Sequence, residues 1–194
     1  EVYCTLTNNN RRGGGGTISS NQPDGSTGAG SARPPVDVAN PRPDNDYGHI
    51  IRWREDGRGH GGLTFLWDIF AFGGPASPDG LGQAGSAIGR DGSIVPLTDG
   101  NIFASPDGLW IDQFGLLWIQ TDMSGSQLTA GPFGNNAMLA ADTETGDIRR
   151  FLVGPYGCEV TGVVSTPDGK SMFVNIQHPG EPPPSTWPTS GRPR

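Results

Sequence analysis

Short apolar runs separated by turn residues recur along this chain. Residues 1–8, 115–122 and 170–178 share one layout, a run rich in β-branched, aromatic and aliphatic residues that closes on a polar one. Gly and Pro stand between the runs. Runs of this length and composition, bounded by turn residues, are typical of β-strands. The pattern therefore predicts an all-β protein.

The spacing of these runs predicts a repeat. The closing residues Asn8 and Asp122 are 114 positions apart, and Asp122 and His178 are 56 apart, so the period is about 56 with one unit in between. Residues 62–70 are the candidate for that unit. Strand-and-turn repeats slightly longer than the roughly 45–50 residues of a four-stranded blade indicate a β-propeller.

The length of the chain predicts an incomplete ring. A closed propeller needs about four to eight blades, whereas 194 residues hold about three units of this period. We therefore expect residues 1–194 to be part of one propeller domain, with the remaining blades outside this chain. Residue 1 is Glu and no signal segment precedes the first strand, so we expect a truncated or processed chain.

Turn residues extend the last two repeats. Residues 105–115 and 158–169 each contain an acidic residue, a strand, a turn and the start of a second strand. Residues 142–147, with sequence DTETGD, are expected to join strands at 138–141 and 148–153 as an outer hairpin.

Two segments interrupt this pattern. The chain contains 32 Gly and 18 Pro, a composition that disfavours long helices. Residues 11–47 are rich in Gly, Pro, Asn and Ser and lack periodicity, which predicts a long insertion loop. Residues 180–194 are rich in Pro and are expected to form an extended tail.

The charge excludes some partners and favours others. A formal net charge of −7 predicts no nucleic-acid partner, and the chain has no apolar run long enough to span a membrane. An acidic surface suits a cation-binding protein, although it also simply maintains solubility. The two cysteines, Cys4 and Cys158, form no disulfide framework or paired metal motif and are expected to be small buried residues.

Two carboxylates are candidate metal ligands. Asp107 and Glu159 stand at the start of the innermost strands of adjacent blades, and such positions converge at one mouth of a propeller channel. Paired carboxylates repel unless they are protonated or share a cation, and hard oxygen ligands suit Ca²⁺. The alternative for Asp107 is ordinary turn chemistry in Pro-Asp-Gly, which is the interpretation we favour for Asp168.

Three strand-end residues return to the same mouth. Asn8, Asp122 and His178 close the second strands, which run antiparallel to the first. They are expected to support the metal ligands or to contact substrate, or else to cap the strand ends as polar residues. The ligand that would correspond to Asn8 falls before Glu1.

An arginine pair is the candidate for anion binding. Arg52 and Arg54 lie on one side of a predicted strand and flank Trp53. A guanidinium group recognises phosphate oxygens in bidentate fashion, and Arg52 is preferred with Arg54 as the alternative. Either side chain could instead form a surface ion pair with Glu55 or Asp56.

Six ordered motifs carry a family resemblance: EVYCTLTNN (1–9), YGHIIRWRE (47–55), SPDGLW (105–110), LWIQTD (117–122), GCEVTG (157–162) and FVNIQHPG (173–180). Together they resemble the carboxyl-terminal part of PhoX-type bacterial alkaline phosphatases, over nearly the whole chain except residues 11–40.

The resemblance implies a six-bladed propeller exported to the periplasm or beyond by the twin-arginine route. It also implies that residues 1–194 are the carboxyl-terminal part of this propeller domain, with the amino-terminal blades outside this chain. It implies hydrolysis of phosphate monoesters at a centre of Ca²⁺ and Fe³⁺, with Asp107 and Glu159 as metal ligands and Arg52 or Arg54 gripping phosphate. The iron ligands, among them a cysteine, are expected mostly outside this chain and are assigned to neither Cys4 nor Cys158. The fragment alone is therefore expected to be inactive.

Two other functions fit the same residues. A lactonase-type propeller also uses a Pro-Asp-Gly acid as a calcium ligand but needs no arginine at the mouth. A calcium-stabilised propeller that only binds partners would need the cation for folding and would have no turnover.

Overall fold

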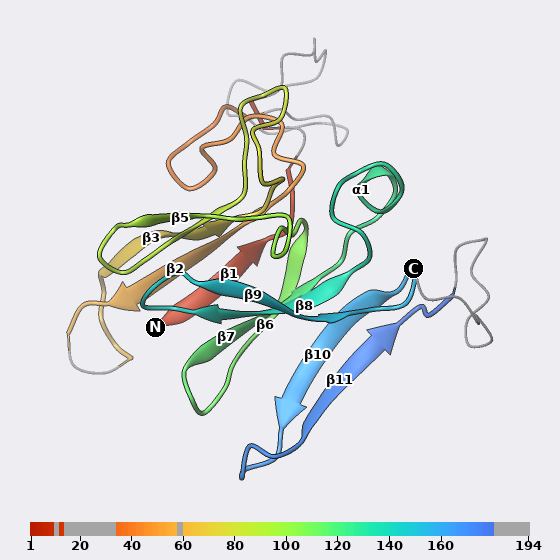
Figure 1. Cartoon of the computed structure of the whole chain (residues 1–194). Helices are drawn as coiled ribbons and strands as arrows, with labels where there is room; N and C mark the ends of the chain where they lie inside the picture. The colour runs from red at the N-terminus through yellow and green to blue at the C-terminus, as the bar shows by residue number, and fades with distance from the viewer. Residues whose placement is uncertain (10–11, 14–33, 58–59, 181–194) are drawn as a thin grey trace, which may run out of the picture.

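The computed structural model describes residues 1–9, 12–13, 34–57 and 60–180, and the regular secondary structure of these residues is almost entirely β-strand (Figure 1). The strands are β1 Val2–Leu6, β2 His49–Glu55, β3 Phe65–Phe72, β4 Ser86–Ile88, β5 Ile94–Pro96, β6 Pro106–Ile111, β7 Leu116–Thr121, β8 Ala137–Asp142, β9 Ile148–Val153, β10 Glu159–Ser165 and β11 Met172–Gln177, with one short helix, α1 Ser126–Thr129. No helix in the described part of the chain is long and apolar enough to cross a membrane.

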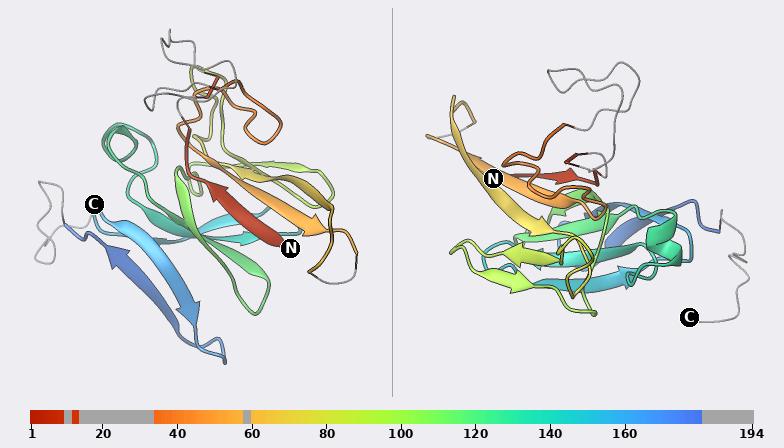
Figure 2. Two further views of the ribbon diagram at one scale, coloured as in Figure 1. Left: turned by 180° about the vertical axis from the view of Figure 1, so that it is seen from behind. Right: turned by 90° about the horizontal axis from the view of Figure 1, so that it is seen from above.

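The strands form three antiparallel sheets. Their orders are β1-β2-β3-β4-β5, β6-β7-β8-β9 and β10-β11. Strand β6 contacts both β1 and β10, so the four-stranded sheet lies between the other two (Figure 2). Neighbouring antiparallel sheets that stack through their inner strands in this way are typical of successive propeller blades. The prediction of an all-β partial propeller is therefore confirmed.

Strand β1 lies where the second strand of a blade belongs. The Thr5 hydroxyl, near the end of β1, donates a hydrogen bond to the backbone oxygen of Asp107 at the start of β6 (2.9 Å). The end of β1 therefore lies beside the start of β6, as the end of β7 does through the pairing of Pro106 with Thr121. This agrees with the alignment of residues 1–8 with residues 115–122.

The unit expected between the first two repeats is not a separate blade. Residues 62–70 contribute to β3, which pairs with β2 in the same sheet as β1, with Trp53 opposite Trp67. The long spacing between Asn8 and Asp122 instead comes from one blade lengthened by the predicted insertion and by the β4–β5 hairpin. Within the predicted insertion and tail, residues 10–11, 14–33 and 181–194 lie outside the described part of the chain.

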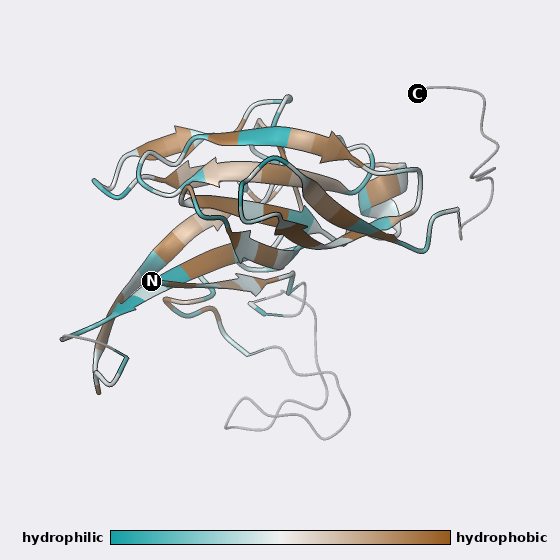
Figure 3. Ribbon diagram, turned by 90° about the horizontal axis from the view of Figure 1, so that it is seen from below, coloured by the Kyte–Doolittle hydropathy of each residue, from teal (hydrophilic) through white to brown (hydrophobic). Residues whose placement is uncertain are grey.

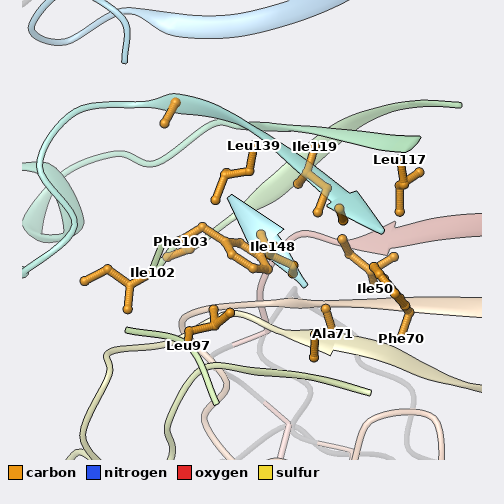
Figure 4. Packing of buried hydrophobic residues seen from close by; sticks show 14 of the residues in the cluster. Ile50, Phe70, Ala71, Leu97, Ile102, Phe103, Leu117, Ile119, Leu139 and Ile148 are labelled. Atoms are coloured by element: carbon orange, nitrogen blue, oxygen red, sulfur yellow. The ribbon is translucent and has the colours of Figure 1, made fainter. Parts of the chain in front are cut away.

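Alternation along β7 builds two cores. Leu117 and Ile119 point into the core between the five-stranded and four-stranded sheets, where they meet Ile50 and Phe70 (Figure 4). Trp118, on the opposite face, packs in a second core with residues of β10 and β11. Because neighbouring side chains of a strand point to opposite faces, one apolar strand can join both neighbouring sheets. Apolar residues accordingly follow the strands in Figure 3.

A buried histidine makes the stability of this fold pH-dependent. His49 lies in β2, where Nδ1 faces the Asn45 amide nitrogen (3.2 Å) and Nε2 faces the Ala39 oxygen (2.7 Å). These partners fit a neutral ring that is protonated on Nε2. Burial lowers the pKa of His49 below its ordinary value of 6.5. Unfolding exposes the ring and lets it take up a proton more readily.

We therefore expect the free energy of unfolding to fall as the pH drops below about 6.5, by up to about 1.4 kcal/mol per pH unit until the lowered pKa is reached. Urea unfolding at pH 7.5, 6.0 and 5.0 measures this slope. His49→Gln should reduce it, whereas His60→Gln, at an exposed position, should leave it unchanged. Equal slopes in both variants would contradict the assignment.

Candidate metal centre

Three strand ends bring three carboxylates together. Asp107 lies at the start of β6, Glu159 is the first residue of β10, and Asp122 directly follows β7. Their side chains each offer an oxygen within 4.8 Å of the other two. The structure therefore brings Asp107 and Glu159 of two blades together, and it adds Asp122 to them within the same 4.8 Å limit.

The three acids affect one another electrostatically. Partial burial raises the pKa of Glu159, and the charges of Asp122 and Asp107 raise it further, while His178 opposes the shift. Partial desolvation and the charge of Asp107 likewise raise the pKa of Asp122. Asp122 and Glu159 are thus harder to ionise than isolated carboxylates, and a bound cation would relieve the repulsion.

The donor chemistry of this group fits a hard cation. Three carboxylates supply oxygen ligands of the kind that Ca²⁺ prefers. Cys158 directly precedes Glu159, but burial raises the pKa of its thiol to about 11, which keeps it neutral at pH 7. The expectation that both cysteines are buried is wrong for Cys4, which is exposed because it lies in β1 at the edge of its sheet, and its Sγ points at the Thr5 oxygen (3.6 Å). Carboxylate oxygens, and not thiolates, are accordingly the metal ligands that this group offers.

A buried asparagine connects the segments that carry two of these acids. Asn136 is 1% exposed, and its Oδ1 accepts hydrogen bonds from the Thr121 hydroxyl (2.8 Å) and the Met123 N–H (2.6 Å). Its Nδ2 donates to the backbone oxygens of Met123 (2.9 Å) and Cys158 (2.7 Å). Thr121 and Met123 flank Asp122, and Cys158 precedes Glu159. One side chain therefore fixes the backbone beside both carboxylates.

The expected strand-end residues do return to this mouth. The Asn8 amide donates to the Ser105 hydroxyl (3.3 Å), and the Asp122 N–H donates to the Ser105 backbone oxygen (2.9 Å). Ser105 is fully buried with a positive φ of 48°. His178 lies beside Asp122 and Glu159 in the wall of a cavity. Whether these residues contact metal or substrate stays a prediction.

That cavity has a volume of about 470 Å³ and borders the acidic group. Asp122 and Glu159 form one part of its wall, and Met123, Leu128 and Tyr156 contribute apolar surface to the rest. It is formed by the loop that carries α1 and by the turn before β10.

The two candidate arginines do not lie in this group. Arg52 is 4% exposed and forms a bidentate ion pair with Asp68 (2.6 and 2.8 Å). Its remaining donors reach the backbone oxygens of Thr143 (3.1 Å) and Gly89 (3.3 Å). Arg52 and Arg54 line a different cavity, which contains none of the three acids. Phosphate recognition by either arginine stays a prediction that no contact within the described residues supports.

These contacts predict that Arg52 stabilises the fold. Replacing it with Ala should lower the free energy of unfolding by about 2–3 kcal/mol, because buried hydrogen bonds that join two sheets are lost. Arg54→Ala, two residues along the same strand at an exposed position, should change it by less than about 0.5 kcal/mol. Urea unfolding compares the two variants, and equal effects would contradict the prediction.

Comparisons with known proteins identify the family to which this chain is similar. The family model described as alkaline phosphatase PhoX matches residues 1–180. A solved structure of Pseudomonas fluorescens PhoX, in complex with the transition-state analogue vanadate, matches with 46% sequence identity and a TM-score of 0.72. The match covers 96% of this chain and 28% of that chain, so the chain spans less than a third of its relative. A search of curated proteins found no match.

Proposed function

Because this chain belongs to the alkaline phosphatase PhoX family, we propose that it is the carboxyl-terminal part of an enzyme that hydrolyses phosphate monoesters. The observation that carries the proposal is the meeting of Asp107, Asp122 and Glu159 at one mouth of the partial propeller. The relative's complex with a transition-state analogue supports phosphoryl transfer as the reaction class.

In this proposal the three carboxylates hold Ca²⁺, with additional ligands and the iron-binding residues contributed from outside this chain. A bound cation would neutralise phosphate oxygens and lower the pKa of a water molecule. The carboxylates act as ligands and not as general acid or base. Asn136 keeps Asp122 and Glu159 at a fixed separation through the backbone on either side.

The proposal includes two properties of the whole protein. The enzyme would act in the periplasm or outside the cell, in keeping with the family resemblance. The 194-residue chain alone would be inactive, because three carboxylates do not provide all the ligands of a centre with several metal ions.

A chimera tests the proposal. This chain replaces the matched segment of Pseudomonas fluorescens PhoX, with which it shares 46% identity. We expect the chimera to hydrolyse p-nitrophenyl phosphate and not gluconolactone. Chelation of its metals should abolish turnover, and Ca²⁺ together with iron should restore it. A folded, metal-loaded chimera that hydrolyses only gluconolactone, or neither compound, would contradict the proposal.

A further inference from the structure

The strand pair that carries Asp107 contains a β-bulge. The register between β6 and β7 shifts between Pro106 and Leu109. Two residues of β6, Asp107 and Gly108, therefore lie opposite one residue of β7, Gln120. Bulges change the direction of a side chain and are frequent beside active sites. This bulge holds one of the three candidate metal ligands.

The residue opposite the bulge has a buried amide without a partner. Gln120 is 1% exposed, and its Nε2 donates no hydrogen bond within the described residues. It stands two positions after Trp118, which packs against β10 and β11, so both side chains point to that face of the sheet. Leaving a buried amide without a partner costs free energy, and such a group requires an explanation.

Gly108 provides the space that this amide occupies. A Cβ atom at position 108 would lie 2.2 Å from Oε1 of Gln120 and 3.2 Å from its Cδ. The φ of Gly108 is not positive, so the missing side chain matters for space and not for the backbone conformation. The amide therefore lies against the backbone of the bulge, next to Asp107.

The Asp107 carboxylate is an acceptor without a donor. It is exposed and accepts no hydrogen bond within the described residues. The carboxylates of Asp79 and Asp168, which stand in the same Pro-Asp-Gly sequence, both accept hydrogen bonds from nearby N–H groups. Carboxylates that bind metals are ordinarily held by a hydrogen bond from outside the ligand set. The bulge thus combines an acceptor that lacks a donor with a donor that lacks an acceptor.

We propose that Gln120 is a positioning residue of the metal centre, and that its Nε2 donates a hydrogen bond to the Asp107 carboxylate when a cation is bound. The inference rests on the proposed function, because it requires Asp107 to be a cation ligand. A carboxylate that is held in one orientation loses less conformational freedom on binding, which raises cation affinity.

Gln120→Met in the chimera tests this role, because methionine keeps the length of the side chain and removes the amide. We expect terbium luminescence to show an affinity about 10-fold lower than that of the parent. The urea midpoint of the metal-free chimera should stay unchanged or rise, because the substitution removes a buried group that lacks a partner. A residue that only stabilised the fold would lower the midpoint.

Gln83→Met is the matched control. Gln83 is also buried, but its Nε2 donates to the Pro43 oxygen (2.6 Å) in the segment between β3 and β4. This substitution removes a hydrogen bond that exists, so it should lower the urea midpoint and leave terbium affinity unchanged.

Double variants identify the acceptor. Gln120→Met should cause no further loss of affinity when Asp107→Ala is already present, whereas it should keep its effect beside Asp122→Ala. Gly108→Ala provides a second route to the same amide, because its Cβ would displace Oε1. It should lower affinity in the parent but not in a Gln120→Ala variant, where the space is free.

The outcomes separate this inference from the proposed function. Unchanged terbium affinity in Gln120→Met, or a urea midpoint lowered as much as in Gln83→Met, would overturn the role of Gln120. So would a full effect of Gln120→Met beside Asp107→Ala. In each case a chimera that hydrolyses p-nitrophenyl phosphate leaves the proposed function standing. A folded chimera that neither binds terbium nor turns over this substrate would overturn both.

Discussion

Glu159→Gln in the chimera is expected to lower kcat for p-nitrophenyl phosphate about 100-fold or more while the protein remains folded. The substitution keeps the shape of the side chain but removes a charged oxygen ligand from the group formed with Asp107 and Asp122. Losing a metal ligand should cost at least as much as the 10- to 100-fold typical of losing a residue that only supports one.

Glu159→Gln should not destabilise the metal-free protein, although it should reduce turnover of the metal-loaded enzyme. Burial and two neighbouring carboxylates raise the pKa of Glu159, so its ionised form is disfavoured in the folded state. A neutral amide at this position should leave the melting temperature of the metal-free protein unchanged or raise it. Calcium should then stabilise the variant less than the parent, as thermal unfolding with and without the cation would show.

A matched acid provides the control. Asp107 and Asp168 stand in the same Pro-Asp-Gly sequence, but Asp168 is exposed in a turn, where it accepts hydrogen bonds from the Thr166 hydroxyl and the Lys170 N–H. Asp107→Asn should reduce turnover as Glu159→Gln does, and Asp168→Asn should not. If Glu159→Gln lowers the melting temperature but leaves turnover intact, the cation serves only to stabilise the propeller.

Local sequence signals predicted much of the fold. The outer hairpin lies at β8 and β9, within one residue of its expected bounds. Its turn is set locally, because Asp142 Oδ1 accepts hydrogen bonds from the N–H groups of Glu144 (2.8 Å) and Thr145 (3.0 Å), and Gly146 has a φ of 78°. Blade membership was harder to predict. The sequence of residues 62–70 predicts a strand but does not show to which blade the strand belongs. Only its pairing with β2 assigns it to the blade of β1.

The candidate site was predictable where it depended on repeat position. Asp107 and Glu159 stand at the starts of the first strands of two blades, and Asp122 follows the end of a second strand. Comparing the repeats in the sequence predicted that these positions lie close together. A local motif alone fails, because Pro-Asp-Gly also occurs at Asp79, which is held by the Tyr47 hydroxyl (2.9 Å) and by nearby backbone N–H groups. Likewise, no local signal around Arg52 shows that Asp68 satisfies its charge across the sheet.

Asn136 is the residue that sequence reasoning missed. It stands just before β8, where an asparagine resembles any loop residue, and its partners are 13 to 22 positions away. Nothing in composition or spacing shows that one amide connects the end of β7 to the start of β10. Only the packing of three strands around it makes the connection visible.

Asn136→Ala is expected to weaken cation binding at least about 10-fold and to lower the free energy of unfolding by about 3–5 kcal/mol. Four hydrogen bonds are lost, and buried backbone groups of Met123 and Cys158 lose their partner, at about 1–3 kcal/mol for each group left unsatisfied. The backbone beside Asp122 and Glu159 can then move, so the carboxylates no longer share one ligand geometry.

The affinity measurement distinguishes positioning from stability alone. Terbium luminescence, read well below the melting temperature, reports cation affinity, and urea unfolding reports stability. Asn101→Ala is the control, because Asn101 also bonds backbone groups, accepting from the Thr98 N–H (2.6 Å) and donating to the Ile148 oxygen (2.7 Å), away from the acids. It should lose stability without losing affinity. If Asn136→Ala behaves in the same way, Asn136 stabilises the fold and does not position the metal ligands.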